Sequence, residues 1–197
     1  MAADRFADML LDQCNRFGLH VFHAIGRCFT SVLAMKRGDF DTGSQLLRAT
    51  IDELDRVEFA LFRTAFLCAI AEGLAGAGRT MEGQATIDDV LERSERREER
   101  WCVAELLRVK GELEIQLDST AASPSAEGYF LQSIDLAHRQ SALSWELRTA
   151  TSLARLWHQQ NRSAEARALL APMRNRFTEG FETVDLRAAD ALLEEIG

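Results

Sequence analysis

Three arginines, Arg108, Arg148 and Arg155, carry the clearest binding chemistry in this sequence. A guanidinium group is planar and can hold a carboxylate through two parallel hydrogen bonds. Each of these arginines falls in a stretch whose apolar residues have helical spacing, so a rigid backbone would hold it in place. We therefore predict a basic patch that clamps a carboxylate or an acidic peptide. The alternative is that Glu105 and Glu112 neutralise the patch.

Other reactive side chains do not form a catalytic or metal-binding pattern. His20 and His23 share one helix face, with Cys28 farther along, but no fourth ligand follows at the spacing of a zinc site. No G-x-S-x-G elbow marks a serine nucleophile. Neighbouring acids such as Glu194 and Glu195 point in different directions from a helix. We therefore expect no enzymatic activity, no metal and no cofactor.

The stretch from Ser144 to Gly180 indicates which elements position the arginines. Two amphipathic helical patterns flank a polar turn at Gln160–Ser163. Ala154 and Ala166, twelve residues apart, place one small residue in each helix, where two antiparallel helices would approach closely. Large apolar residues follow three positions after the first alanine and four after the second. This spacing is typical of a tetratricopeptide repeat.

The rest of the chain resembles looser copies of this hairpin. Gly83 follows Ala71 by twelve residues, and Gly111 takes the same small position in a later helix. Ala71, Gly111 and Ala154 are 40 and 43 residues apart, whereas the usual repeat has ~34 residues. We predict an all-α fold with a single domain over residues 1–197. In it, about four antiparallel hairpins plus terminal helices stack as a tetratricopeptide-like right-handed superhelix, an α-solenoid.

Periodicity and capping signals place the individual helices. The first is expected over residues 3–17, with Phe6, Met9 and Leu10 facing inward and Gly18 as its C-terminal stop. Side-chain oxygens are expected to cap four later helices, at Asp39, Thr80, Ser123 and Thr183. The later helices are expected over His20–Lys36, Phe40–Arg56, Phe59–Ala77, Met81–Arg93, Trp101–Leu117, from Pro124 to about His138, on both sides of Gln160–Ser163, and up to Ile196.

In such a stack, the first helix of each hairpin lines a concave groove. The groove positions lie six and three residues before the small residue, and one and four residues after it. Seven of these residues form the predicted groove site for a peptide or ligand: Glu72, Glu105, Arg108, Glu112, Arg148, Arg155 and His158.

Composition argues against several classes of partner. The formal net charge of −8 would repel phosphates, so we expect no direct nucleic-acid binding. No apolar run approaches the ~20 residues of a membrane-spanning helix. Asp4, Asp8 and Asp12 interrupt the first apolar stretch, unlike a signal peptide. We expect a cytoplasmic protein, with no membrane partner, whose four cysteines are reduced and partly buried.

Longer segments resemble a known family. The match is carried by SWELR, ATSLARLW, AEARALLAP and FTEGF, and upstream by GDFDTGSQLLRATIDEL and FRTAFLCAIAEGLAGAGR. These are similar to the carboxy-terminal tetratricopeptide region of bacterial regulators, where it follows a winged-helix or adenylate-cyclase-type domain and an ATPase domain. This sequence contains no G-x-x-x-x-G-K-[ST] phosphate loop, and Asn161 stands where a turn glycine is common. The resemblance implies a helical region that binds proteins or peptides without catalytic residues.

Together, these patterns predict a non-catalytic protein–protein interaction or scaffold module. It would be the sensor or partner-docking part of a bacterial transcriptional or signalling system, with a protein or peptide as partner. Two alternatives are left: a small-molecule sensor that binds a metabolite in the groove, and a homodimer formed through an exposed terminal helix.

Overall fold

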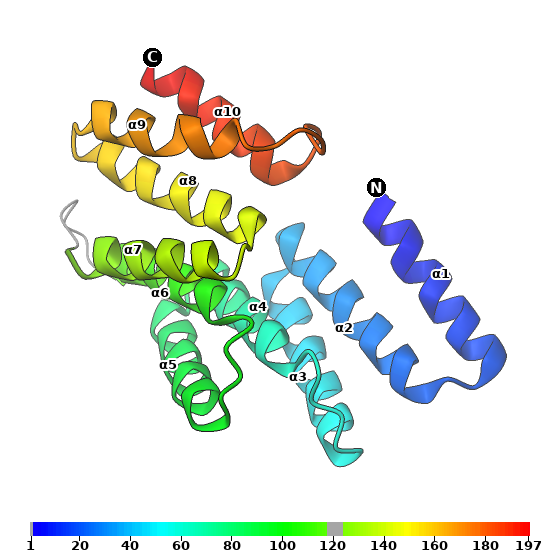
Figure 1. Cartoon of the computed structure of the whole chain (residues 1–197). Coiled ribbons are helices and arrows are strands. Elements are labelled where there is room, and N and C mark those ends of the chain that lie inside the picture. Colours follow the sequence, from blue (N-terminus) through cyan, green and yellow to red (C-terminus); the bar gives the residue numbers. More distant parts are fainter. Residues whose placement is uncertain (1, 118–123) are drawn as a thin grey trace. The chain divides into compact units, whose positions relative to one another are not determined.

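The computed structural model describes residues 2–117 and 124–197, and all its regular structure there is helical, with no strand. Figure 1 shows the course of the ten helices found in these two ranges. They are α1 (Ala2–Phe17), α2 (His20–Lys36), α3 (Phe40–Arg56), α4 (Arg63–Gly76), α5 (Thr80–Arg97), α6 (Val103–Leu117), α7 (Pro124–Arg139), α8 (Leu143–Gln159), α9 (Ser163–Arg174) and α10 (Val184–Ile196). The predicted cap Ser123 lies outside the described residues.

The chain divides into two compact units, which we call the N-terminal unit (Met1–Arg93) and the C-terminal unit (Ser94–Gly197). Helix α5 crosses the boundary between them. The single repeat domain over residues 1–197 stays a prediction. None of the described helices combines the length and the apolar character that a membrane span requires.

The N-terminal unit is built around α2 and α3. Helix α1 packs on α2, α2 packs on α3 and α4, and α3 packs on α4. Helix α3 turns one apolar face into this core, where Leu47, Ile51 and Leu54 are buried. The core consists of Ala24, Ile25, Cys28, Met35, Leu47, Ile51, Leu54, Phe66, Ile70 and Leu74.

The predicted inward orientation of α1 is wrong for Phe6 and Met9, whereas Leu10 is half-buried against α2. Phe6 and Met9 are 59% and 54% exposed, whereas Ala7 and Cys14 are buried. The reason is the side on which α1 packs on α2: a Cβ atom at Gly26 would come within 2.8 Å of the Leu11 side chain and 3.4 Å of the Leu10 side chain. The buried Ala7 and Cys14 share this side of α1, so the opposite turn of the helix leaves Phe6 and Met9 facing solvent.

Two helices begin later than predicted. Phe59 and Phe62 precede α4, and Trp101 precedes α6, so these residues lie outside the helices. Phe59 and Phe62 still pack against the core of the N-terminal unit. The helical spacing of apolar residues therefore extends into segments whose backbone is not helical. For this reason the spacing predicts helix starts that are too early.

A common turn ends most of the helices. The backbone after seven helices takes a positive φ, at Gly18, Gly38, Glu58, Gly78, Glu98, Ser141 and Asn161. At each turn the following amide donates a hydrogen bond to a carbonyl farther back in the helix, as Asp39 does to Ala34. This is the Schellman arrangement. The positions from Gly18 to Glu98 are evenly spaced along the chain, and Ser141 and Asn161 are separated by the same interval.

Replacing Ser141 by glycine is expected to stabilise the C-terminal unit. Ser141 has φ +55°, a conformation that costs an L-residue roughly 1 kcal/mol and that glycine adopts freely. Because glycine also gains entropy in the unfolded chain, the net gain in free energy of unfolding should be about 0.5 kcal/mol. Urea titration would measure it. Ser141→Ala is the control, and equal stability of the alanine and glycine variants would contradict the strain argument.

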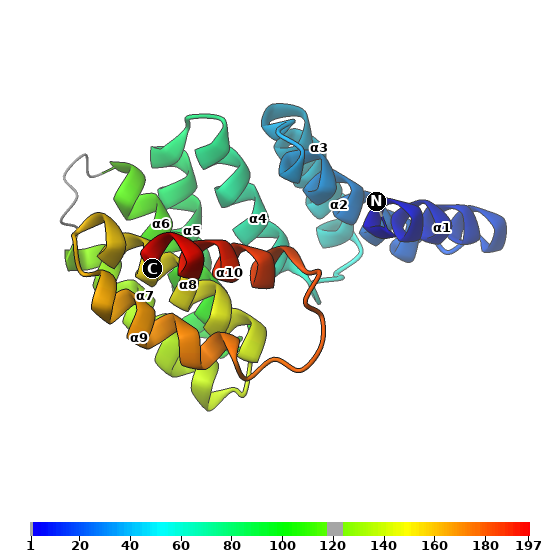
Figure 2. The same cartoon turned by 90° about the horizontal axis from the view of Figure 1, so that it is seen from above.

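The C-terminal unit is a series of neighbouring helices. Helix α6 packs on α7, α7 on α8 and α8 on α9, while α10 packs on both α8 and α9 (Figure 2). The predicted small residues Ala154 and Ala166 are fully buried where α8 meets α9. Ser133 is buried in α7, and its hydroxyl donates to the Ala104 carbonyl of α6 at 2.7 Å. Of the small positions predicted from the sequence, Ala154 and Ala166 therefore lie at a helix contact, and so does Gly111, which faces Phe130.

Candidate functional site

Six of the seven residues of the predicted groove site lie on α6 and α8 of the C-terminal unit. The seventh, Glu72, lies on α4 of the N-terminal unit. Helices α6 and α8 contact each other directly, so neighbouring side chains on their facing turns can meet. We call the group Glu105, Arg108, Glu112, Arg148, Ser152 and Asp185 the α6–α8 charged cluster.

Glu105 is the centre of the α6–α8 charged cluster. Its carboxylate accepts hydrogen bonds from Nε and Nη2 of Arg108, at 3.0 and 2.9 Å. On its other side, Nη1 of Arg148 lies 2.6 Å from Oε1 of Glu105. The side chains of Glu105 and Arg108 are only 9% and 8% exposed. One buried carboxylate therefore joins two arginines from two helices.

The remaining members extend the cluster along both helices. The Ser152 hydroxyl of α8 donates to Oε1 of Glu112 on α6 at 2.5 Å, and Glu112 lies 3.7 Å from Arg108. At the other end, Arg148 lies 3.6 Å from Asp185, near the start of α10. A docking carboxylate would have to compete with Glu105 for both guanidinium groups, so the arginine clamp stays a prediction.

Arg155 and His158 lie farther along α8. Arg155 is exposed. Nδ1 of His158 is 2.8 Å from the Ser163 hydroxyl, and its Nε2 is 3.6 Å from a carboxylate oxygen of Glu195. His158 is thus placed by α9 and α10 rather than by the α6–α8 charged cluster, and Arg155 is the site arginine that most fully faces solvent.

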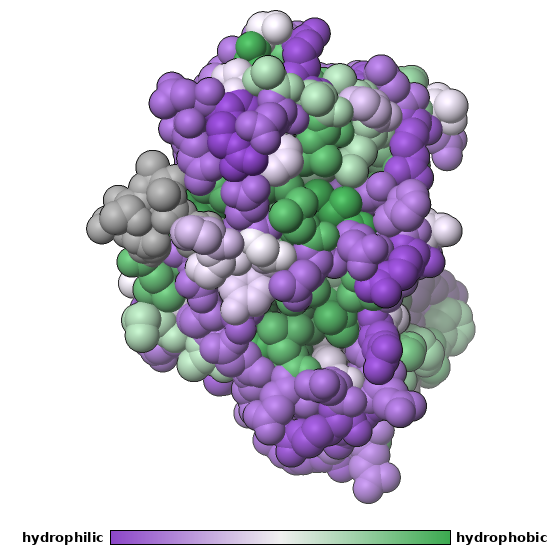
Figure 3. Space-filling model, turned by 60° about the vertical axis from the view of Figure 1, so that its left-hand side comes forward, coloured by the Kyte–Doolittle hydropathy of each residue, from purple (hydrophilic) through white to green (hydrophobic). Residues whose placement is uncertain are grey.

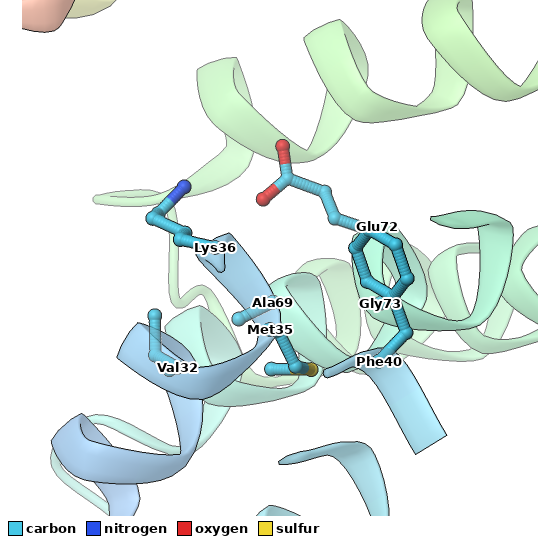
Figure 4. A pocket seen from close by; sticks show the side chains of 7 residues that line it. All are labelled: Val32, Met35, Lys36, Phe40, Ala69, Glu72 and Gly73. Carbon is cyan, nitrogen blue, oxygen red and sulfur yellow. The ribbon is translucent and has the colours of Figure 1, made fainter. Parts of the chain in front are cut away.

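Glu72 borders a separate cavity of about 250 Å³ within the N-terminal unit. Figure 4 shows the Lys36 amine and the Glu72 carboxylate extending toward the same side, with Met35 between α2 and α4 below them. The remaining lining residues are Val32, Phe40, Ala69 and Gly73. Glu72 belongs to the N-terminal unit, whereas the six other predicted groove residues belong to the C-terminal unit.

Sequence reasoning missed a second buried carboxylate, Glu146 at the start of α8. Nη1 of Arg176 lies 2.8 Å from its Oε2, and Nδ1 of His138 lies 3.2 Å from its Oε1. Glu146 is 3% exposed. The available signal was its spacing, because Glu146 lies four residues before Ala150 and seven before Leu153, and all three therefore share one buried face of α8.

Cys102 lies beside the α6–α8 charged cluster and is not a reactive thiol. The pKa of Cys102 is raised to about 12, chiefly by burial and in smaller part by the Glu105 carboxylate, while Arg148 partly opposes the shift. The thiolate is the nucleophilic form of cysteine, so Cys102 stays protonated near neutral pH. All four cysteines are free and buried.

The described surface mixes polar and apolar character. On the face in Figure 3, hydrophobic side chains form strips that lie between hydrophilic ones. Trp101 and Trp145 add an aromatic pair, with ring centroids 6.3 Å apart, and Trp101 is 43% exposed. Within residues 2–117 and 124–197, no three His, Cys, Asp or Glu side chains come close enough to hold a metal ion.

Comparison with known proteins gives a likeness of fold. No family model matches the chain, and no curated protein matches it. The chain is similar to the crystal structure of BtubC (BKLC) from P. vanneervenii, with a TM-score of 0.67 and 16% sequence identity. The similarity covers 100% of this chain and 90% of BtubC. At this identity the likeness concerns the helical fold alone.

Proposed function

We propose that the chain is a non-catalytic protein–protein interaction module that uses the α6–α8 face to dock a protein or peptide. The observation that carries the proposal is the α6–α8 charged cluster, whose buried Glu105 and Arg108 hold the partly exposed Arg148 and Glu112 in place. A surface that is ordered before binding loses little conformational entropy when a partner docks. Arg155, farther along α8, exposes its side chain to solvent beside this cluster.

The architecture that we propose is a tetratricopeptide-like right-handed superhelix. It is supported by the evenly spaced left-handed turns from Gly18 to Glu98 and by the small residues buried between α8 and α9. The likeness to BtubC over the whole chain is compatible with it. The resemblance to the carboxy-terminal region of bacterial regulators adds the proposed setting, a cytoplasmic transcriptional or signalling system in which docking shifts the state of a regulator.

One observation favours a second function, small-molecule sensing. A cavity of about 240 Å³ lies between the start of α8, the loop after α9 and the start of α10. Its apolar walls are Leu147, Phe177 and Leu186, and its polar groups include Asp185, which belongs to the α6–α8 charged cluster. A metabolite bound there would act directly on the Arg148–Asp185 pair.

Charge reversal at Arg155 is expected to remove partner binding while the fold stays intact. The intact chain and Arg155→Glu would be used as baits in an extract of the source organism, with captured proteins quantified by mass spectrometry. We expect at least about a tenfold loss of specific capture, which corresponds to about 1.4 kcal/mol. The melting temperature should stay the same, because Arg155 is exposed.

Arg139→Glu is the matched control. Arg139 is an exposed arginine on α7, and its Nη2 lies 2.7 Å from Oδ2 of Asp135, one turn earlier in the same helix. Equal capture by the intact chain and Arg155→Glu would contradict docking on the α6–α8 face. In that case a thermal-shift screen with metabolites, using Asp185→Asn as the insensitive variant, would test the sensing function.

A further inference from the structure

The N-terminal unit has an apolar groove between α1 and α2. It has a volume of about 330 Å³, which is enough for a few side chains of a partner. Seven of its eight lining residues are apolar, and the eighth is a lysine: Ala3, Phe6, Ala7, Leu10, Phe29, Val32, Leu33 and Lys36. Phe6 and Phe29 are 59% and 43% exposed, so the groove presents aromatic surface to solvent.

The apolar surface extends beyond the groove along α1. Phe6, Met9 and Phe17 are each more than half exposed, and their spacing keeps them on one face of the helix. Phe6 and Phe17 are eleven residues apart, which is roughly 16 Å along a helix. A surface about three turns long is matched by a helix lying alongside, while a small molecule would cover only part of it.

Cationic side chains lie at both ends of this surface. The Arg5 guanidinium is 5.3 Å from the Phe6 ring centre, and that of Arg16 is 5.4 Å from the Phe17 ring centre. Lys36 lines the groove itself. Asp4 lies at the same end, and its carboxylate accepts a hydrogen bond from Arg37, so it does not supply net negative charge to the groove.

We infer that this groove docks an amphipathic helix of a partner protein, one whose apolar stripe is flanked by acidic residues. A second copy of the chain would bring its own Lys36 to the same groove, where like charges repel. Acidic residues on a partner helix would meet the Lys36 amine instead. Asp8 and Asp12 lie on the side of α1 opposite to the groove by helical geometry, so they do not repel it. The inference goes beyond the proposed function, because it does not involve the α6–α8 charged cluster.

A pair of synthetic helices tests the inference. One fluorescein-labelled 15-residue peptide carries leucine at i, i+3, i+7 and i+11 with glutamate on both flanks, and the other has lysine in place of every glutamate. Titrated with the full chain and followed by fluorescence anisotropy, the glutamate peptide should bind at least about tenfold more tightly than the lysine peptide. Added salt should reduce the difference, because exposed charges are screened.

Variants of the chain assign the binding to the groove. Lys36→Glu and Phe6→Ala should each weaken binding of the glutamate peptide by at least about tenfold. Both positions are exposed, so circular dichroism and the melting temperature should not change. Arg56→Glu, an exposed charge reversal on α3, is the control and should bind as the unaltered chain does.

Four results would overturn the inference: no binding of either peptide, equal binding of the two, binding that Lys36→Glu leaves unchanged, or a dimer in light scattering that Phe6→Ala converts to monomer. Binding to phosphatidylserine vesicles that Phe6→Ala abolishes would assign the surface to membranes instead. None of these results bears on Arg155, so the proposed function is tested separately.

Discussion

Replacing Glu105 by glutamine is expected to cause the largest loss of stability in the C-terminal unit, about 3 kcal/mol in the free energy of unfolding. The Glu105 carboxylate holds Arg108 through two hydrogen bonds and Arg148 through a third contact. A glutamine has one acceptor oxygen and no charge, so it cannot satisfy both arginines. Arg108, whose side chain is 8% exposed, would then lose the charged partner of its two hydrogen bonds while its guanidinium stays buried.

Urea titration followed by circular dichroism would measure the effect. Glu112→Gln is the matched control, because the Glu112 side chain is 35% exposed and contacts Arg108 only at 3.7 Å. We expect a cost of less than about 1 kcal/mol there. The double variant Glu105→Leu, Arg108→Met should recover most of the stability, since replacing a buried ion pair by apolar residues is often neutral. A loss below about 1 kcal/mol for Glu105→Gln would show that solvent, not Glu105, compensates Arg108.

The sequence predicts helices well where one apolar face is continuous and the turns are short. Helices α2 and α3 have the expected bounds, because each is followed by a turn that a glycine or a change of polarity marks. The predicted caps were less accurate. Asp39 and Thr183 take the N-cap positions, but neither side chain makes a capping hydrogen bond. Thr80 is already the first residue of α5.

The regular interval between the helix-ending turns is partly visible in the sequence. Gly38 and Gly78 follow Gly18 at one and three times the same interval along the sequence. The other left-handed positions cannot be read so directly, because Glu58, Glu98 and Ser141 have no preference for a positive φ. These three residues are exposed, and the hydrogen bond that the following amide donates back into the helix accompanies the conformation at each of them.

For the candidate site too, the sequence predicts some features and misses others. The groove positions on α6 and α8 were counted from small residues, and the two helices do bring Glu105, Arg108 and Arg148 together. Sequence spacing does not predict how deeply each side chain is buried. The extent of burial decides whether an arginine binds a partner or a neighbouring glutamate. The same limit applies to α1, where a helix with few neighbours buries its small residues and exposes Phe6 and Met9.

Gly111→Ala is expected to destabilise the C-terminal unit by about 2 kcal/mol, although alanine is the better helix former. A Cβ atom at Gly111 would lie 2.5 Å from Cε1 of Phe130 and 2.9 Å from two further ring atoms. Phe130 is fully buried against Ala126, Leu153 and Leu156, so the ring cannot move aside without shifting α7 or α8. The clash should therefore exceed the gain of about 1 kcal/mol in helix propensity.

Gly128→Ala provides the opposite expectation within the neighbouring helix. No atom lies within 4 Å of a Cβ added at Gly128, so only the propensity gain applies and the variant should be more stable by about 0.5–1 kcal/mol. The sign of the difference between the two variants, measured by urea titration, isolates the contact between α6 and α7. Adding Phe130→Leu to Gly111→Ala should cost less than the two separate changes would predict, because the smaller side chain leaves space for the methyl group. If Gly111→Ala were as stable as Gly128→Ala, the close approach of α6 to Phe130 would be wrong, and with it the role of the small residue at this position of the hairpin.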